Sequence, residues 1–139
     1  MRPLFHPAIE DISVEGILHA LSDPVRAAIY ADMLCQEYAQ SCSTFLRVLG
    51  RPIPKSTLSQ HFRILRESGL IWSERQGIEV KNSSRYPELE ARFPGLIEAI
   101  VKAHRIEMDE THSRKAIAMP PAKSAVKRSR WRAARVPEP

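Results

Sequence analysis

Between Lys55 and Gly69 the chain distributes its apolar and polar residues with the period of an amphipathic α-helix. Leu58, Phe62 and Leu65 recur at positions i, i+4 and i+7, which places an apolar stripe on one side of the helix. Gly69 is a natural C-terminal stop. The opposite face carries hydroxyl, amide and guanidinium groups, which belong to Ser56, Thr57, Ser59, Gln60, Arg63 and Arg66. The segment is therefore expected to pack on a core with one face and to offer hydrogen bonds with the other.

A second helix start lies about thirty residues upstream. Asp23 can accept hydrogen bonds from the first amides of a helix, and Pro24 suits the first helical position. Val25, Ile29 and Met33 then mark the buried face of that helix.

Together, Ala20–Arg26 and Pro54–Ile71 closely resemble the ArsR family of bacterial winged helix-turn-helix regulators, over roughly residues 12–104. The resemblance implies a mainly α fold with a small β-hairpin wing, which dimerises through its terminal helices. It also implies a homodimeric transcriptional repressor that binds double-stranded DNA and leaves it on an unidentified signal. We expect a winged helix-turn-helix domain over residues 7–110 and a basic, disordered tail over residues 111–139. A protein-interaction module that does not read DNA is the alternative.

The polar face of the 55–67 segment is the candidate DNA-binding surface. Amide and guanidinium groups pair in bidentate fashion with purine edges, so Gln60 and Arg63 are the candidate base readers. Hydroxyls and cations hold phosphates, especially near a helix N-terminus. The candidate phosphate contacts are Lys55, Ser56, Thr57 and Ser59. His61 faces either the DNA or the core. An ordinary amphipathic surface helix would show the same periodicity.

Residues 70–75 and 78–83 are expected to form two short strands around a turn at Gln76-Gly77. In the resembling family this hairpin is the wing. Arg75, together with Lys81 or Arg85, would then reach a minor groove or a flanking phosphate. A solvated hairpin whose charges guard a sheet edge is the alternative. Trp72 is expected in core or interface packing.

Two further amphipathic helices are expected at the ends of the domain, from about Pro7 to Leu21 and from Leu96 to about Glu110. In the resembling family such helices build a two-fold dimer. The predicted interface residues are Val14, Ile17, Leu18, Leu96, Ile97, Ile100, Val101 and His104. The alternative is that both helices only close the core of one chain.

A short support helix is expected around Phe45, Leu46, Val48 and Leu49, before a turn at residues 50–54 that two prolines stiffen. In the resembling family a small hydroxyl residue usually stands at the position of Pro54.

Cys35 and Cys42 are inert or structural thiols, a redox pair, or two ligands of a soft metal. His104 and Glu107 resemble half of a zinc site found in some family members, but the other half is missing. No metal site and no cofactor are therefore expected.

The charge of the chain is divided unevenly. Residues 1–111 contain 13 Lys and Arg against 15 Asp and Glu, whereas residues 112–139 contain 8 against 1. The tail therefore adds nonspecific phosphate contacts or is a solvated extension. Within the domain, residues 47–85 hold eight Lys and Arg against three Glu, which is where a DNA-binding surface requires positive charge.

No leader sequence, membrane-spanning run, phosphate-binding loop or nucleophile-and-base pair is recognisable. The sequence therefore predicts a cytoplasmic, nucleoid-associated protein that is not an enzyme.

Overall fold

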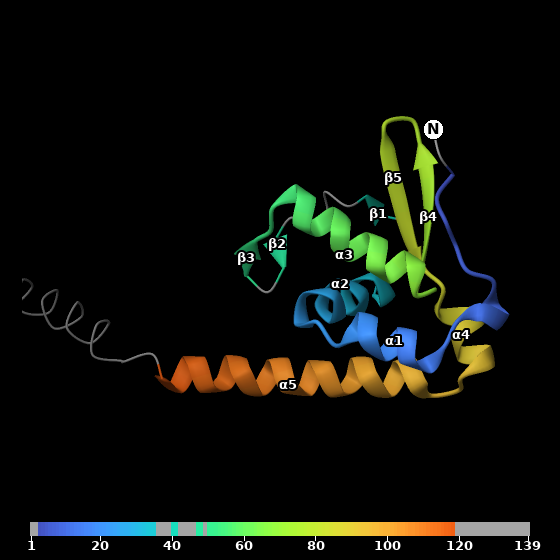
Figure 1. The fold of residues 1–139 in the computed structure, drawn as a ribbon. Coiled ribbons are helices and arrows are strands. Elements are labelled where there is room, and N and C mark those ends of the chain that lie inside the picture. Colours follow the sequence, from blue (N-terminus) through green and yellow to red (C-terminus); the bar gives the residue numbers. More distant parts are fainter. Residues whose placement is uncertain (1–2, 36–39, 42–46, 49, 119–139) are drawn as a thin grey trace, which may run out of the picture. The chain divides into compact units, whose positions relative to one another are not determined.

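The computed structural model describes residues 3–35, 40–41, 47–48 and 50–118 (Figure 1). A 3₁₀ turn at Ile9–Asp11 precedes two helices and three two-residue strands. The order is α1 (Val14–Leu21), α2 (Pro24–Leu34), β1 (Gln40–Ser41), β2 (Arg47–Val48), β3 (Arg51–Pro52), α3 (Lys55–Glu67), β4 (Ile71–Gln76), β5 (Glu79–Ser84), α4 (Tyr86–Arg92) and α5 (Leu96–Ala118). The chain divides into two units, Met1–His104 and Arg105–Pro139.

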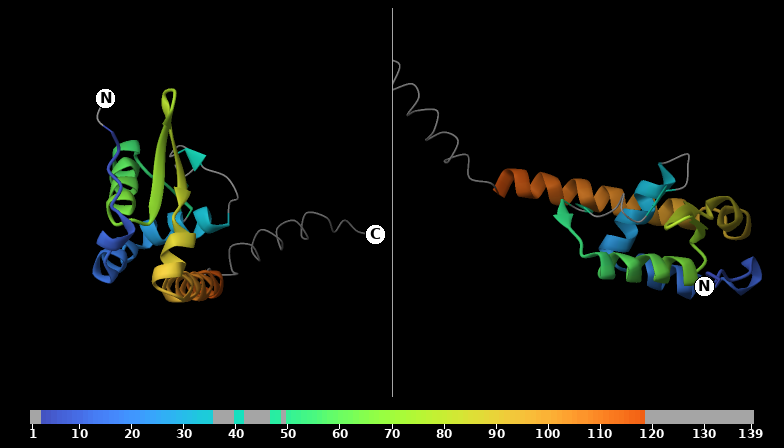
Figure 2. Two further views of the ribbon diagram at one scale, coloured as in Figure 1. Left: turned by 90° about the vertical axis from the view of Figure 1, so that its right-hand side faces the viewer. Right: turned by 90° about the horizontal axis from the view of Figure 1, so that it is seen from above.

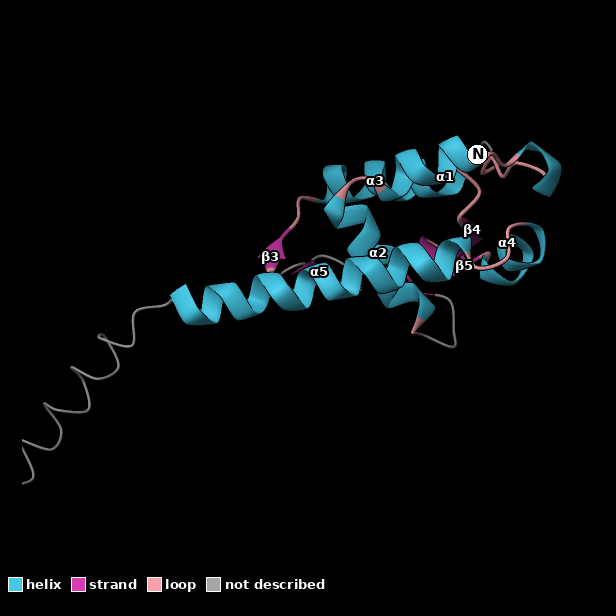
Figure 3. Ribbon diagram, turned by 90° about the horizontal axis from the view of Figure 1, so that it is seen from below, coloured by secondary structure: helices cyan, strands magenta, loops and turns pink. Residues whose placement is uncertain are grey.

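The fold is a winged helix-turn-helix, and it is mainly helical (Figure 3). β4 and β5 pair in antiparallel fashion, and β1 adds to β5, so that the sheet order is β1-β5-β4. The β4–β5 hairpin projects away from the helices (Figures 1 and 2). This hairpin is the predicted wing.

The wing turn lies one residue later than the sequence suggested. Gln76 pairs with Glu79, so the two turn residues are Gly77 and Ile78 rather than Gln76 and Gly77. Gly77 has a φ of 65°, the left-handed conformation that such a two-residue turn requires.

The prediction of a support helix at residues 45–49 is wrong at Val48. This residue lies in β2 and pairs with Arg51 of β3. Gly50 has a φ of 74°, a conformation that turns the chain back between strands and does not continue a helix. Phe45, Leu46 and Leu49 lie outside the described residues.

The terminal helices differ from their predicted bounds. α1 begins at Val14 rather than near Pro7, because the Ser13 hydroxyl caps it by accepting a hydrogen bond from the Gly16 amide at 3.0 Å. α5 continues to Ala118, past the expected end at Glu110 and into the segment predicted as a disordered tail. The rest of that tail lies outside the described residues.

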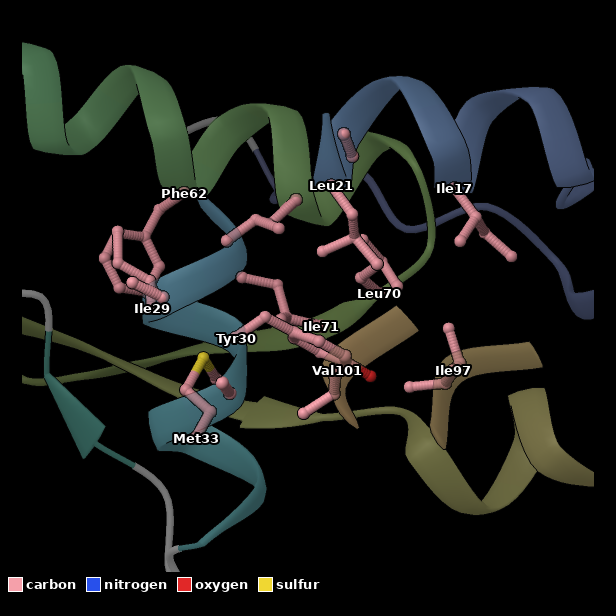
Figure 4. Packing of buried hydrophobic residues seen from close by; sticks show 14 of the residues in the cluster. Ile17, Leu21, Ile29, Tyr30, Met33, Phe62, Leu70, Ile71, Ile97 and Val101 are labelled. Atoms are coloured by element: carbon pink, nitrogen blue, oxygen red, sulfur yellow. The ribbon is translucent and has the colours of Figure 1, made fainter. Parts of the chain in front are cut away.

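The core gathers around α2, which is buried on most of its surface (Figure 4). Asp23 caps this helix as predicted, accepting from the Val25 amide at 2.8 Å. Three predicted interface residues also belong to this core: Ile17 and Ile97 are 0 % exposed and Val101 is 6 % exposed. Their assignment to a dimer interface is therefore corrected, since each is already buried within one chain.

Candidate nucleic-acid interface

Helix α3 has the two faces that the sequence predicted. Leu58, Phe62 and Leu65 are buried in the core. Five of the six predicted polar-face residues are exposed, as is Lys55, while Arg66 is half-buried; the exposed set is Lys55, Ser56, Thr57, Ser59, Gln60 and Arg63. The hydrogen-bonding groups of this face therefore point away from the core.

The two ends of α3 are defined differently. Pro54 precedes the helix with extended backbone angles and supplies no side-chain cap. At the other end Gly69 has a φ of 87°, and a Cβ at this position would overlap the buried side chain of Ile12. The C-terminal end therefore requires glycine both for its backbone conformation and for the space beside it.

His61 lies at the edge of the polar face, against α2. Its Nδ1 is 3.5 Å from a terminal nitrogen of Arg26, which is itself buried. The Arg26 guanidinium also donates to the carbonyls of Ala20 at 2.6 Å and His19 at 3.3 Å. Arg26 thus links the end of α1 to α3, a role that sequence reasoning missed.

Arg63 carries an ion pair that sequence reasoning also missed. Its Nε–H donates to a carboxylate oxygen of Glu67 at 2.9 Å, one helical turn later. Both side chains are exposed to solvent, at 61 % for Arg63 and 46 % for Glu67. The hydrogen bond to Glu67 raises the pKa of Arg63.

The wing presents a mixed surface. Arg75 is exposed and lies opposite Val80, while Lys81 pairs with Glu79 at 3.0 Å. Ile78, at the turn, is fully exposed. Of the two predicted wing contacts, Arg75 is therefore exposed and Lys81 is half-buried.

Arg85 does not belong to this surface, and its interpretation as a DNA contact is corrected. It is 2 % exposed and donates to the Pro7 carbonyl and to the Glu88 carboxylate, each at 2.8 Å. Hydrogen bonding to Arg85 lowers the pKa of Glu88. A buried guanidinium with these partners holds the N-terminal segment against the base of the wing.

Trp72 was expected in core or interface packing. Its side chain is 40% exposed on β4, so it does not belong to the core. Its indole N–H donates to Glu88 at 3.0 Å, and its ring contacts that of His6, with the ring centroids 4.8 Å apart. Burial, followed by the charges of Arg66 and Arg85, lowers the pKa of His6.

Part of the predicted dimer surface remains accessible. Leu18 is 49 % exposed, and four further predicted interface residues are half-buried: Val14, Leu96, Ile100 and His104. In the second unit, described by itself, Ile106 and Ile117 of α5 are exposed.

Cys35 caps the C-terminal end of α2 and is exposed, whereas Cys42 lies outside the described residues. Within the described ranges, no three His, Cys, Asp or Glu side chains are arranged to hold a metal ion. No described helix combines the length and the apolar character needed to cross a membrane.

Comparison with known proteins gives a domain match and a similar solved structure. A family model described as a helix-turn-helix domain matches residues 21–73, the segment from the end of α1 into β4. The chain is similar to the solved structure of an ArsR-like transcriptional regulator from Rhodococcus sp. RHA1, with 22% sequence identity and a TM-score of 0.46, covering 76% of this chain and 92% of that chain. The comparison with curated proteins gave no match. The domain match includes α3 and its polar face.

Proposed function

We propose that this chain is a winged helix-turn-helix protein of the ArsR type and a sequence-specific transcriptional regulator that binds double-stranded DNA. The match of residues 21–73 to a helix-turn-helix domain supports this proposal. The observation that carries this proposal is the exposed polar face of α3, which a buried apolar stripe fixes to the core beside a projecting hairpin. A helix held in this way can enter a major groove without losing its packing.

Each side chain of that face has a role that suits its chemistry. Gln60 and Arg63 read base edges, since amide and guanidinium groups match the paired donors and acceptors of purines. The uncapped first turn of α3 offers amides to a phosphate, and the neighbouring cation and hydroxyls extend that site; the residues are Lys55, Ser56, Thr57 and Ser59. His61 contacts the sugar–phosphate backbone of the DNA at the edge of this face.

The wing supplies the second contact. Arg75 and Lys81 lie on the projecting hairpin, where they meet flanking phosphates or the minor groove. These contacts fix the orientation of α3 and carry no base information themselves.

The protein acts as a homodimer that represses transcription. Leu18 offers exposed apolar surface on α1, and Leu96 and Ile100 offer partly exposed surface on α5. A two-fold axis through such a surface places two copies of α3 on half-sites about 34–36 Å apart. The bound dimer represses transcription by occupying a promoter. A signal that changes the conformation of the dimer releases it from the DNA. The protein acts in the cytoplasm.

Fluorescence anisotropy tests this proposal. The protein is titrated onto its own upstream DNA and onto a scrambled duplex at several salt concentrations, and again with oxidant and with zinc. We expect the protein to prefer the upstream DNA by orders of magnitude. The Gln60→Ala, Arg63→Ala double variant is expected to lose this preference, and Glu107→Ala on α5 is expected to retain it. Loss of binding under one additive identifies the class of signal.

Equal and steeply salt-dependent binding to both duplexes would contradict sequence-specific regulation by this surface. Binding that the double variant leaves unchanged would indicate that the polar face of α3 is solvent, as in a protein-interaction module.

A further inference from the structure

Glu67 places a negative charge on the face of α3 that is proposed to meet DNA. It follows Gln60 by seven residues and Arg63 by four, spacings that bring all three onto one side of a helix. A carboxylate at this position opposes the phosphates of any duplex and weakens binding to all sequences. Glu67 is therefore expected to have a role that offsets this loss of DNA affinity.

The stability of the helix does not supply that role. Glu67 is the last residue of α3, where the negative end of the helix dipole disfavours a carboxylate. The pair also runs from the cation to the anion along the chain, which is the less favourable order at i,i+4. Because both side chains are exposed, the ion pair itself contributes little to folding.

The geometry of the pair indicates what Glu67 does. An arginine carries five N–H donors in a rigid fork, and the contact at 2.9 Å uses the single one on Nε. The Nη1 and Nη2 groups remain available for O6 and N7 of guanine, the pair of acceptors that a guanidinium reads in the major groove. Holding Nε also removes rotamer freedom that a flexible arginine would lose on binding.

We propose that Glu67 is a positioning residue that orients the Arg63 guanidinium for bidentate readout of a guanine. This inference rests on the proposed function and adds to it the base that Arg63 selects. Glu67 reduces affinity for DNA in general and increases the difference between the correct sequence and the others. It acts on specificity through Arg63 and does not itself contact the DNA.

The test compares Glu67→Ala with Glu74→Ala, which removes an exposed carboxylate from the wing and leaves the Arg63 pair intact. Anisotropy is measured on the upstream duplex, on scrambled DNA, and on a set of duplexes that each carry one substituted base pair. Both variants are expected to bind scrambled DNA more tightly. Only Glu67→Ala is expected to lower the ratio of specific to nonspecific affinity, by about tenfold or more.

The substituted duplexes identify the base pair concerned. Glu67→Ala and Arg63→Ala are expected to lose preference at the same G·C pair, and the double variant to lose no more than Arg63→Ala alone. An unchanged specificity ratio in Glu67→Ala would overturn the inference and leave the proposed function standing. Loss at a different base pair would also overturn it, because Glu67 would then read a base directly. Absence of any preference in the unaltered protein would overturn the proposed function itself.

Thermal unfolding of the variants accompanies these titrations. Because Glu67 is exposed, its replacement is expected to leave the unfolding temperature nearly unchanged. In the DNA-free protein, the ¹H–¹⁵N signal of Arg63 Nε is expected to shift in Glu67→Ala and to stay in place in Glu74→Ala. An unshifted signal in both variants would contradict the positioning contact.

Discussion

The guanidinium carbon of Arg85 lies 4.0 Å from the ring centre of Trp72, a cation–π contact at the base of the wing. The same guanidinium bonds the Pro7 carbonyl, and on the neighbouring strand residue the Ser73 amide donates to His6 Nε2 at 2.9 Å. The N-terminal segment and the wing are thus held together by two separate polar contacts.

Arg85→Met is expected to lower the free energy of unfolding by about 2–4 kcal/mol, because it leaves the Pro7 carbonyl without its buried donor and removes the ion pair with Glu88. Urea denaturation measures the effect. Arg114→Met on the exposed part of α5 is the control, with a change within about 0.5 kcal/mol. The salt dependence of DNA binding is expected to stay unchanged. A lower salt slope with normal stability would restore Arg85 as a phosphate contact.

Gly69→Ala is expected to destabilise the protein by about 2–4 kcal/mol, since the new Cβ adds strain at a φ of 87° and overlaps Ile12. Gly95→Ala is the matched control. Its φ is 80°, but open space surrounds the position, so only the backbone cost of about 1–2 kcal/mol applies. Equal losses of stability in the two variants would show that the side chain of Ile12 yields to the added methyl group.

Stability is expected to fall as the pH drops below about 6.5, partly through His6. The pKa of His6 is lowered in the folded state, so the unfolded chain takes up the proton first. The stability that neutral His6 contributes is fully present above pH 6.5, the pKa of the unfolded state. It is lost as the pH falls towards the lower pKa of the folded state. His6→Gln keeps an acceptor for Ser73 but does not titrate, so it is expected to flatten this dependence in urea denaturation between pH 8 and pH 5.

His112→Gln, on the exposed part of α5, serves as the control for that experiment and is expected to keep the unaltered pH dependence. Identical slopes in the His6 variant and the unaltered protein would exclude a contribution from His6.

Lys55→Ala and Gln60→Ala are expected to weaken DNA binding in different ways. Loss of a phosphate contact reduces affinity for all sequences and lowers the salt slope by about 1. Loss of a base reader costs about 1–3 kcal/mol on the specific duplex and relaxes preference at one base pair. Anisotropy at three or more salt concentrations separates the two effects. A uniform loss in both variants would place Gln60 among the phosphate contacts.

Leu18→Asp is expected to convert a dimer into a monomer, because it puts a charge into the proposed apolar interface of α1. Ile78→Asp on the wing is the control, since Ile78 is also exposed but lies outside that interface. Sedimentation equilibrium gives the mass of each. A Leu18 variant that stays dimeric would move the interface elsewhere.

Local signals in the sequence predicted α2 and α3 well. Helix α2 starts at Asp23-Pro24, and α3 has an apolar stripe at positions 58, 62 and 65. Both features depend only on residues close in sequence, and the structure confirms both. The wing was predicted correctly, except that both of its strands and its turn lie one residue later than expected. The exposed polar face of α3 followed from the same periodicity.

Features that depend on distant partners were not predictable in this way. Arg85 looked like a surface cation, because its partner Pro7 is 78 residues away in the chain. The error at Val48 has another cause: its partner Arg51 is only three residues away, but the apolar pattern that suggested a helix does not show the tight turn between them. Helix α4 was not recognised at all. The Arg63–Glu67 pair, in contrast, was readable from its i,i+4 spacing and was overlooked.

The position of β4 gives the N-terminal segment one more consequence. β4 is the outer strand of its sheet, and an outer strand offers unpaired amides on which another chain can build. His6 occupies one of these amides, at Ser73, and the segment that carries it runs beside β4 (Figure 1). The segment that carries His6 therefore covers part of the outer edge of β4, where a strand of another molecule could otherwise pair.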